Sequence, residues 1–197
     1  MSSYRSLVKT VAGPADARCN VSVTLQCGCD AALMAHLILP TTSVQASYLQ
    51  GETETAMEER SPTSWLAEAA ADFTGFVARR CGIRELWGVP VTELWFVDWP
   101  DYIGTVIIRH RLTPALAREG GHIGYHVVPR HRGRGHATQM LAQAKPACQA
   151  LGLTELLITC GEDNIGSRRV IEANGGVLER IVDGEARYWL PTSHHDA

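Results

Sequence analysis

A basic turn with two glycines, set between a strand and a helix, is the feature that most constrains this chain. Residues 129–137 read PRHRGRGHA, directly after an apolar run that ends at Val127 and Val128. Glycines one residue apart let the backbone turn tightly, and a helix start adds unpaired N–H groups and a positive dipole end. Three arginines add charge and forked donors. The turn therefore predicts a phosphate or pyrophosphate site within an α/β fold.

Two familiar phosphate-binding loops do not fit this turn. A Walker loop requires Gly-Lys-Ser/Thr at the helix start, whereas Gly135 is followed by His136 and Ala137. The dinucleotide fingerprint requires a third glycine, where this chain has Thr138. The pattern that fits is Arg/Gln-x-x-Gly-x-Gly/Ala, in two overlapping registers that begin at Arg130 and Arg132.

This pattern resembles the pyrophosphate loop of the GNAT superfamily, the acetyl-CoA-dependent N-acetyltransferases. In GNAT proteins an Asn after the fifth strand, a small residue three positions later and a glycine pair at the next helix end complete the CoA site. Here Asn164, Ser167 and Gly175-Gly176 follow the strand-like run 156–160. The strings GGHIGY, RHRL and RYW, at 120–125, 109–112 and 187–189, resemble an uncharacterised subgroup of predicted acetyltransferases. The resemblance spans roughly residues 35 to 191.

The resemblance implies an α/β domain over residues 33–197, with a mixed, mostly antiparallel twisted sheet flanked by helices and with splayed fourth and fifth strands. Residues 1–32 do not match and form an expected extension. Hydrophobic periodicity, caps and turns supply the elements. Strands are expected at 36–40, 92–97, 103–109, 122–128, 156–160, 177–182 and 185–190, and helices at 44–59, from 61 to about 81, at 114–118 and after the glycine turn.

The resemblance also implies direct attack of an amine on an acetyl thioester, and it assigns the CoA site. The pyrophosphate would be held by Arg132, Gly133, Arg134, Gly135, His136, Ala137 and Thr138, and the rest of CoA by Asn164 and Ser167. Backbone N–H groups near Val127 and Val128 would polarise the acyl carbonyl as charge develops on its oxygen.

The proton-transfer groups are open at this stage. His122 is the first candidate for the base, with His110 and Tyr125 as rivals or water in their place. Many family members carry an acidic Tyr seven residues after the Asn, where this chain has Ile171. Ser167, Tyr125 or solvent could replace that Tyr as the acid.

Composition narrows the function further. A net charge of −3 argues against a general nucleic-acid binder. Six cysteines in a 197-residue chain are typical of reduced thiols in a cytoplasmic protein, and the pair in Cys27-Gly-Cys29 lacks the partners of a metal site. The apolar run 31–40 is too short to cross a membrane.

The expected function is an N-acetyltransferase that moves an acetyl or other acyl group from CoA, without a metal, to a small-molecule amine. One alternative is an acyl carrier protein as donor or a protein amine as acceptor. Another is a non-catalytic CoA-binding sensor. The acidic helix that contains Glu52, Glu54, Glu58 and Glu59 hints at a cationic acceptor. Either a monomer or a homodimer is compatible with the sequence.

Overall fold

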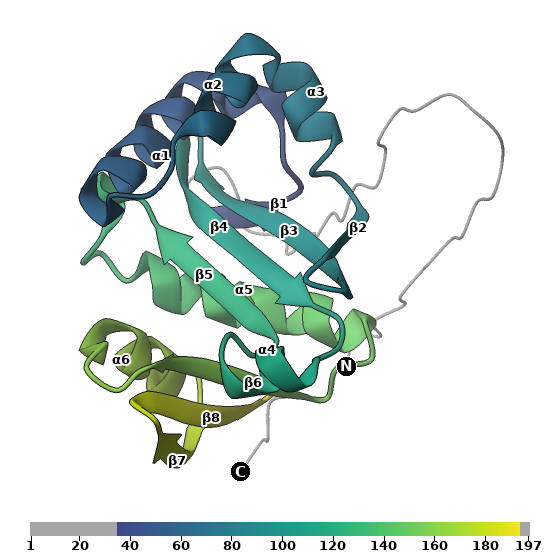
Figure 1. Ribbon diagram of the computed structural model, residues 1–197, viewed down its shortest axis with the longest axis vertical. Coiled ribbons are helices and arrows are strands. Elements are labelled where there is room, and N and C mark those ends of the chain that lie inside the picture. Colours follow the sequence, from purple (N-terminus) through teal and green to yellow (C-terminus); the bar gives the residue numbers. More distant parts are fainter. Residues whose placement is uncertain (1–34, 194–197) are drawn as a thin grey trace, which may run out of the picture.

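The strands form two separate sheets in the computed structural model, which describes residues 35–193 (Figure 1). The larger sheet has the order β1-β3-β4-β5, with β2 also paired to β3, and the smaller has the order β6-β8-β7. All of these pairings are antiparallel. The strands are β1 His36–Ile38, β2 Ile83–Leu86, β3 Val89–Asp98, β4 Asp101–Arg109, β5 Ile123–Val127, β6 Glu155–Gly161, β7 Val177–Val182 and β8 Glu185–Pro191.

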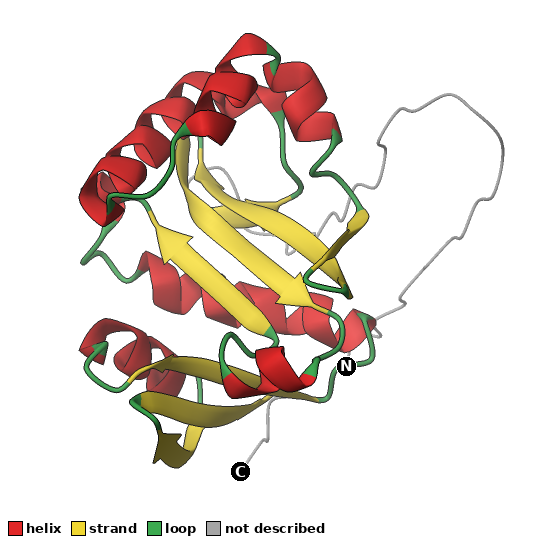
Figure 2. Cartoon of the chain, in the orientation of Figure 1, coloured by secondary structure: helices red, strands yellow, loops and turns green. Residues whose placement is uncertain are grey.

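Helices cover both faces of the larger sheet (Figure 2). Neighbouring residues of β3 point to opposite faces: Trp95 packs in a cluster with α1 and α3, whereas Phe96 packs with α5. The helices are η1 Thr42–Val44, α1 Gln45–Glu59, α2 Ser64–Ala71, α3 Phe73–Ala78, α4 Pro114–Arg118, η2 Pro129–His131, α5 His136–Ala150 and α6 Ile165–Ala173.

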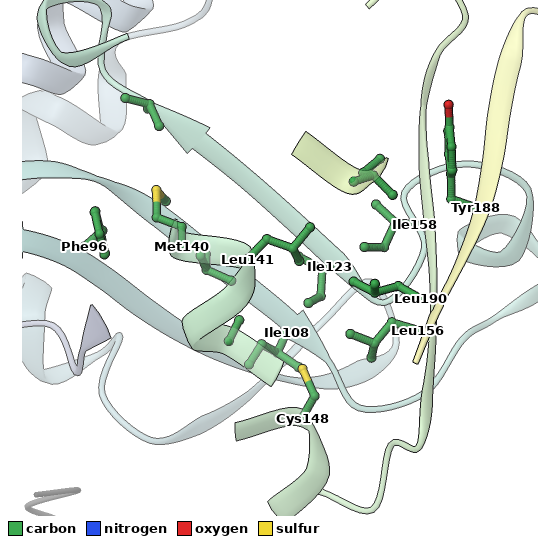
Figure 3. Packing of buried hydrophobic residues seen from close by; sticks show 14 of the residues in the cluster. Phe96, Ile108, Ile123, Met140, Leu141, Cys148, Leu156, Ile158, Tyr188 and Leu190 are labelled. Atoms are coloured by element: carbon green, nitrogen blue, oxygen red, sulfur yellow. The ribbon is translucent and has the colours of Figure 1, made fainter. Parts of the chain in front are cut away.

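Helix α5 joins the two sheets into one core (Figure 3). Its Met140 and Leu141 are fully buried and share a cluster with Ile123 of β5 and with Leu156 and Ile158 of β6. Burying a side chain of this size contributes roughly 1.5–3 kcal/mol. Packing on α5 therefore fixes how the smaller sheet sits beside β5.

The expected mixed α/β class and the splay of the fourth and fifth strands are confirmed, these strands being β5 and β6. They share no ladder, and the segment just before β5 contacts the middle of β6. There the N–H of His122 donates to the carbonyl of Leu157 at 2.7 Å, and the N–H of Gly120 donates to Thr159 Oγ1 at 2.8 Å. Gly121 has a φ of +60°, and a Cβ there would lie 2.3 Å from the Leu157 oxygen. Only glycine lets the strands approach this closely.

Most expected elements are confirmed within a residue or two, including α4, the hairpin β7–β8 and the helix after the glycine turn. The expectation of one helix from 61 to about 81 is wrong. Asp72 ends α2 and caps α3, because its carboxylate accepts the Gly75 N–H at 2.9 Å. Strand β2 was not expected. The proposed extension, with Cys27 and Cys29, lies outside the described residues.

Candidate active site

The glycine turn before α5 exposes backbone donors. Gly133 and Gly135 have φ values of +74° and +82°, and a Cβ on either would meet nothing within 4 Å. Gly135 is the N-cap of α5 and supplies no side-chain cap. Within residues 35–193, the first-turn N–H groups of His136, Ala137 and Thr138 have no acceptor. Converging N–H groups at a helix start bind anions.

Two of the turn's three arginines are paired with α1. Arg130 Nε lies 3.0 Å from Glu54, and Arg132 Nη1 lies 2.5 Å from Glu58. Arg132 Nε also donates to the Val127 carbonyl at 2.8 Å. Arg134 has no carboxylate partner in the described part of the chain.

These pairs change the interpretation of the acidic helix. Glu54 and Glu58 face the basic turn, and Glu52 binds His126. Three of the four carboxylates therefore bind side chains of the protein itself, which weakens the hint that this helix attracts a cationic acceptor.

The hydrogen-bond ladder decides which N–H groups of β5 face the opening toward β6. The N–H of Val128 donates to the Ile103 carbonyl at 2.9 Å, and the N–H of Arg109 donates to the His122 carbonyl at 2.8 Å. In an antiparallel pair only every second residue of a strand bonds to the neighbouring strand. His122 and Val128 bond to β4, so the N–H groups of Tyr125 and Val127 point away from β4, toward β6. The expectation that the Val128 N–H polarises the acyl carbonyl is therefore wrong, because this N–H is already bonded. The N–H of Val127 points in the required direction.

The diverging strands leave an opening of about 210 Å³ that brings together several of the predicted site residues. It is lined by Arg109, Gly120, Ile123, Gly124, Tyr125, Ile158, Thr159, Cys160, Asn164 and Ser167. Asn164 caps α6, its Oδ1 accepting the Ser167 N–H at 3.0 Å. The Tyr125 hydroxyl donates to the Ser167 carbonyl at 3.4 Å. Burial raises the pKa of Tyr125 to about 12, so this hydroxyl stays protonated.

The structure corrects the first choice of base. Nδ1 of His122 accepts the Leu157 N–H at 2.9 Å, so the neutral ring carries its proton on Nε2. Burial lowers the pKa of His122 and favours that neutral form. His122 therefore joins the two sheets and has no free basic nitrogen. His110 does not line the opening, and its Nε2 lies 2.8 Å from Thr92 Oγ1.

A second imidazole, overlooked in the sequence, is paired with a buried carboxylate; like His110, it is not among the residues that line the opening. His126 Nε2 lies 2.7 Å from Glu52 Oε1, and the Tyr102 hydroxyl donates to the same oxygen at 2.6 Å. Glu52 is 5% exposed, whereas the His126 side chain is 36% exposed. Burial alone would lower the pKa of His126, but the hydrogen bond and charge of Glu52 raise it. An imidazole whose Nε2–H is held by a carboxylate keeps Nδ1 available as a base.

Ile171, at the position where the family often has a tyrosine, belongs to the core. It is fully buried, and a Cβ on Gly176 would lie 2.3 Å from its Cγ2. No hydroxyl can act from that place. In residues 35–193 no group of His, Cys, Asp and Glu side chains could hold a metal ion. None of the described helices is long and apolar enough to cross a membrane.

An anion-binding turn at a helix start, beside two strands that part and expose N–H groups, can hold the phosphate groups of a ligand next to donors for a developing oxyanion. The sequence matches the model of the acetyltransferase (GNAT) domain over residues 29–177. The chain therefore belongs to the GNAT acetyltransferase family and is an acyltransferase. Enzymes of this family use an acyl-CoA co-substrate.

Solved structures share the fold at low sequence identity. The microcin C7 self-immunity acetyltransferase MccE, in complex with acetyl-CoA and AMP, aligns with a TM-score of 0.53 and 16% identity, over 79% of this chain and 91% of that one. RimL, a ribosomal L7/L12 alpha-N-protein acetyltransferase, gives 0.52 and 17%, over 80% and 95%. A phosphinothricin acetyltransferase from Sinorhizobium meliloti, in complex with acetyl-CoA, gives 0.51 and 18%, over 80% and 88%. No curated protein sequence matches the chain.

Proposed function

We propose that this protein transfers an acyl group, acetyl in the simplest case, from CoA to the amine of a small molecule. The observation that carries the proposal is the turn 133–138, whose open glycines and unpaired helix-start N–H groups face one point. The pyrophosphate of CoA binds there, with Arg132 and Arg134 beside it. The pantetheine arm lies in the opening between β5 and β6, next to Asn164 and Ser167.

Acyl transfer in this site needs one donor that polarises the acyl carbonyl, the loss of two protons from the nitrogen and the protonation of one thiolate. The Val127 N–H stabilises the charge that develops on the acyl oxygen. His126 takes the proton that the attacking ammonium must lose, and Glu52 acts as the positioning residue for its ring. The nitrogen lone pair forms the C–N bond, and the C–S bond breaks as the Tyr125 hydroxyl protonates the leaving thiolate. The nitrogen then loses its second proton, which returns to the Tyr125 oxygen, and His126 gives its proton to solvent.

Particular observations separate this proposal from its alternatives. A site for a nucleotide pyrophosphate supports free CoA as donor over an acyl carrier protein. The Glu52–His126 pair and the Tyr125 hydroxyl support catalysis over a non-catalytic sensor. For the acceptor, the similar structures include enzymes named for a small molecule and for a protein, and the amine panel described below decides between them.

We assign the acyltransferase domain to residues 33–197 and residues 1–32 to an extension; the family match from residue 29 supports a boundary close to this. We also propose a cytoplasmic location, supported by thiols at Cys148 and Cys160 that form no disulfide.

The experiment compares acetyl-CoA with acetyl-pantetheine, which lacks the pyrophosphate and nucleotide. Calorimetry should show binding of acetyl-CoA, and a thiol-release assay with a broad amine panel should show turnover with acetyl-CoA at far lower concentration than with acetyl-pantetheine. Equal use of both donors would contradict the pyrophosphate site. Binding without release of thiol for any amine would establish the sensor instead.

A further inference from the structure

Arg109, the last residue of β4, is a buried cation without a carboxylate. The residue is 9% exposed, and within residues 35–193 no acidic side chain lies within ion-pair distance of it. Its Nη1 donates to the carbonyls of Gly120 and Gly121 at 2.8 and 3.1 Å, and its Cζ lies 4.7 Å from the centre of the Trp87 ring. Its buried Nε has no hydrogen-bond partner. Two carbonyls and one ring face leave the charge of this guanidinium uncompensated.

The unpaired side of this guanidinium faces the opening. Both Arg109 and Gly124 line it, and a Cβ placed on Gly124 would lie 3.5 Å from Arg109 Nη2. Because Gly124 has no side chain, nothing from that residue covers Nη2 on the side of the opening. A cation at the edge of a partly enclosed volume is a receptor for an anionic group, and a guanidinium fork fits a carboxylate best.

We propose that Arg109 binds a carboxylate of the acceptor, so that the substrate is an amino acid or a close relative with its amine a few bonds from an acid group. This inference rests on the proposed function. His126 and Gly124 are two residues apart on one face of β5, which separates them by about 7 Å along the strand. The amine next to His126 and the carboxylate on Arg109 therefore belong to one small molecule.

The test compares amino acids with their own amides as acceptors in the thiol-release assay, with acetyl-CoA as donor. The amides carry the more acidic ammonium and are intrinsically the better nucleophiles at neutral pH, so a preference for the acids must come from the protein. For the wild type we expect a higher kcat/KM with the acids. Arg109→Gln should reduce the acid-to-amide ratio roughly 10²-fold, mainly through KM, because it removes one partner of a buried charge pair. Binding of acetyl-CoA in calorimetry should not change.

Two further variants separate recognition from folding, since Arg109 also holds the Gly120-Gly121 turn. Gly124→Ala adds a methyl group in ordinary contact distance of Arg109 and should raise KM for acids while the melting temperature stays near wild type. Arg111→Gln is the matched control: this arginine is 60% exposed, pairs with Glu85, and should leave the acid-to-amide ratio unchanged.

Three results would overturn the inference: a wild type that prefers the amides, an Arg109→Gln variant that loses both acceptors equally, or an enzyme that acylates amines but no amino acid. In each of these the proposed acyl transfer would still stand. A wild type that neither binds acetyl-CoA nor releases thiol would instead refute the proposed function and this inference together.

Discussion

His122 directly precedes strand β5 and His126 lies within it, and their imidazoles are held by opposite kinds of partner. Nδ1 of His122 accepts a backbone N–H from Leu157, whereas Nε2 of His126 is paired with the carboxylate of Glu52. Burial lowers the pKa of His122, but in His126 the carboxylate outweighs burial and raises it. The two histidines therefore contribute to stability with opposite dependence on pH.

His122→Ala should destabilise the fold but leave the pH dependence of kcat/KM unchanged. The folded-state pKa of His122 is lowered, so its contribution is present above the unfolded value of about 6.5 and is lost as the pH falls toward the folded value. Denaturant unfolding from pH 8 to 5 should show a difference between wild type and variant that shrinks with acidification. If the variant has wild-type stability but its kcat/KM no longer rises with pH, His122 is the base after all.

His126→Ala should reduce kcat/KM roughly 10²-fold. In the wild type, kcat/KM should rise with pH through an apparent pKa above 6.5, and the variant should lose this rising limb of the profile. Glu52→Gln should move that limb to lower pH, because the raised pKa depends on the carboxylate. The stability that Glu52 gives His126 is full below about 6.5 and is lost as the pH rises through the folded value. Tyr102→Phe is the control, since it removes the hydroxyl's bonds to Glu52 and Thr105 but keeps the Glu52–His126 pair. An unmoved limb in Glu52→Gln would exclude the pair from proton transfer.

Gly135→Glu should abolish acetyl-CoA binding, because a carboxylate would occupy the anion site. Gly152→Glu provides a matched control in the turn after α5: its φ is +80° against +82°, and neither position has an atom within 4 Å of a new Cβ. The two variants should lose similar stability, of order 1–2 kcal/mol. Calorimetry should separate them, and equal affinity in both would refute the site.

Asn164→Ala and Asn164→Asp separate capping from contact with the pantetheine. The alanine variant loses the cap on Ser167 and should cost about 1 kcal/mol, whereas aspartate caps a helix as well as asparagine does. If the side-chain amide contacts the donor, Asn164→Asp keeps the melting temperature but raises KM for acetyl-CoA. A wild-type KM in the aspartate variant would leave Asn164 as a cap alone.

Tyr125→Phe should lower kcat by 10- to 10²-fold with little change in KM for acetyl-CoA, since it removes the proton donor for the thiolate and keeps the ring. Because the pKa of Tyr125 is about 12, the wild-type rate should show no loss from its ionisation up to pH 9. Cys160→Ser, on the facing strand, is the control for disturbance of the opening. An unchanged kcat in Tyr125→Phe would assign protonation to water.

Local signals made much of the fold predictable. The glycine spacing predicts the turn before α5, Thr113-Pro114 predicts the start of α4, and Asp183-Gly184 predicts the turn of the last hairpin. Each signal depends only on the conformations that a few adjacent residues allow. The break at Asp72 was missed because the apolar stripe continues across it, from Ala69 to Phe73. Strand β2 was missed because its residues show no clear alternation.

The proton acceptor could not be found in the same way. His126 and Glu52 are 74 positions apart, and only the packing of α1 on the sheet brings them together. The same packing pairs Arg132 with Glu58 and so neutralises part of the acidic surface of α1. Side-chain partners across a sheet depend on register and helix placement, which neither periodicity nor spacing contains.

The hydrogen bonds that join His122 to Leu157 close the gap between β5 and β6 at one end. A ligand arm that lies between these strands can extend only as far as these bonds. Free CoA that remains in the gap therefore blocks the next acyl-CoA until it dissociates. The Gly120-Gly121 turn, which lets the strands touch, also sets how far into the protein such a ligand can reach.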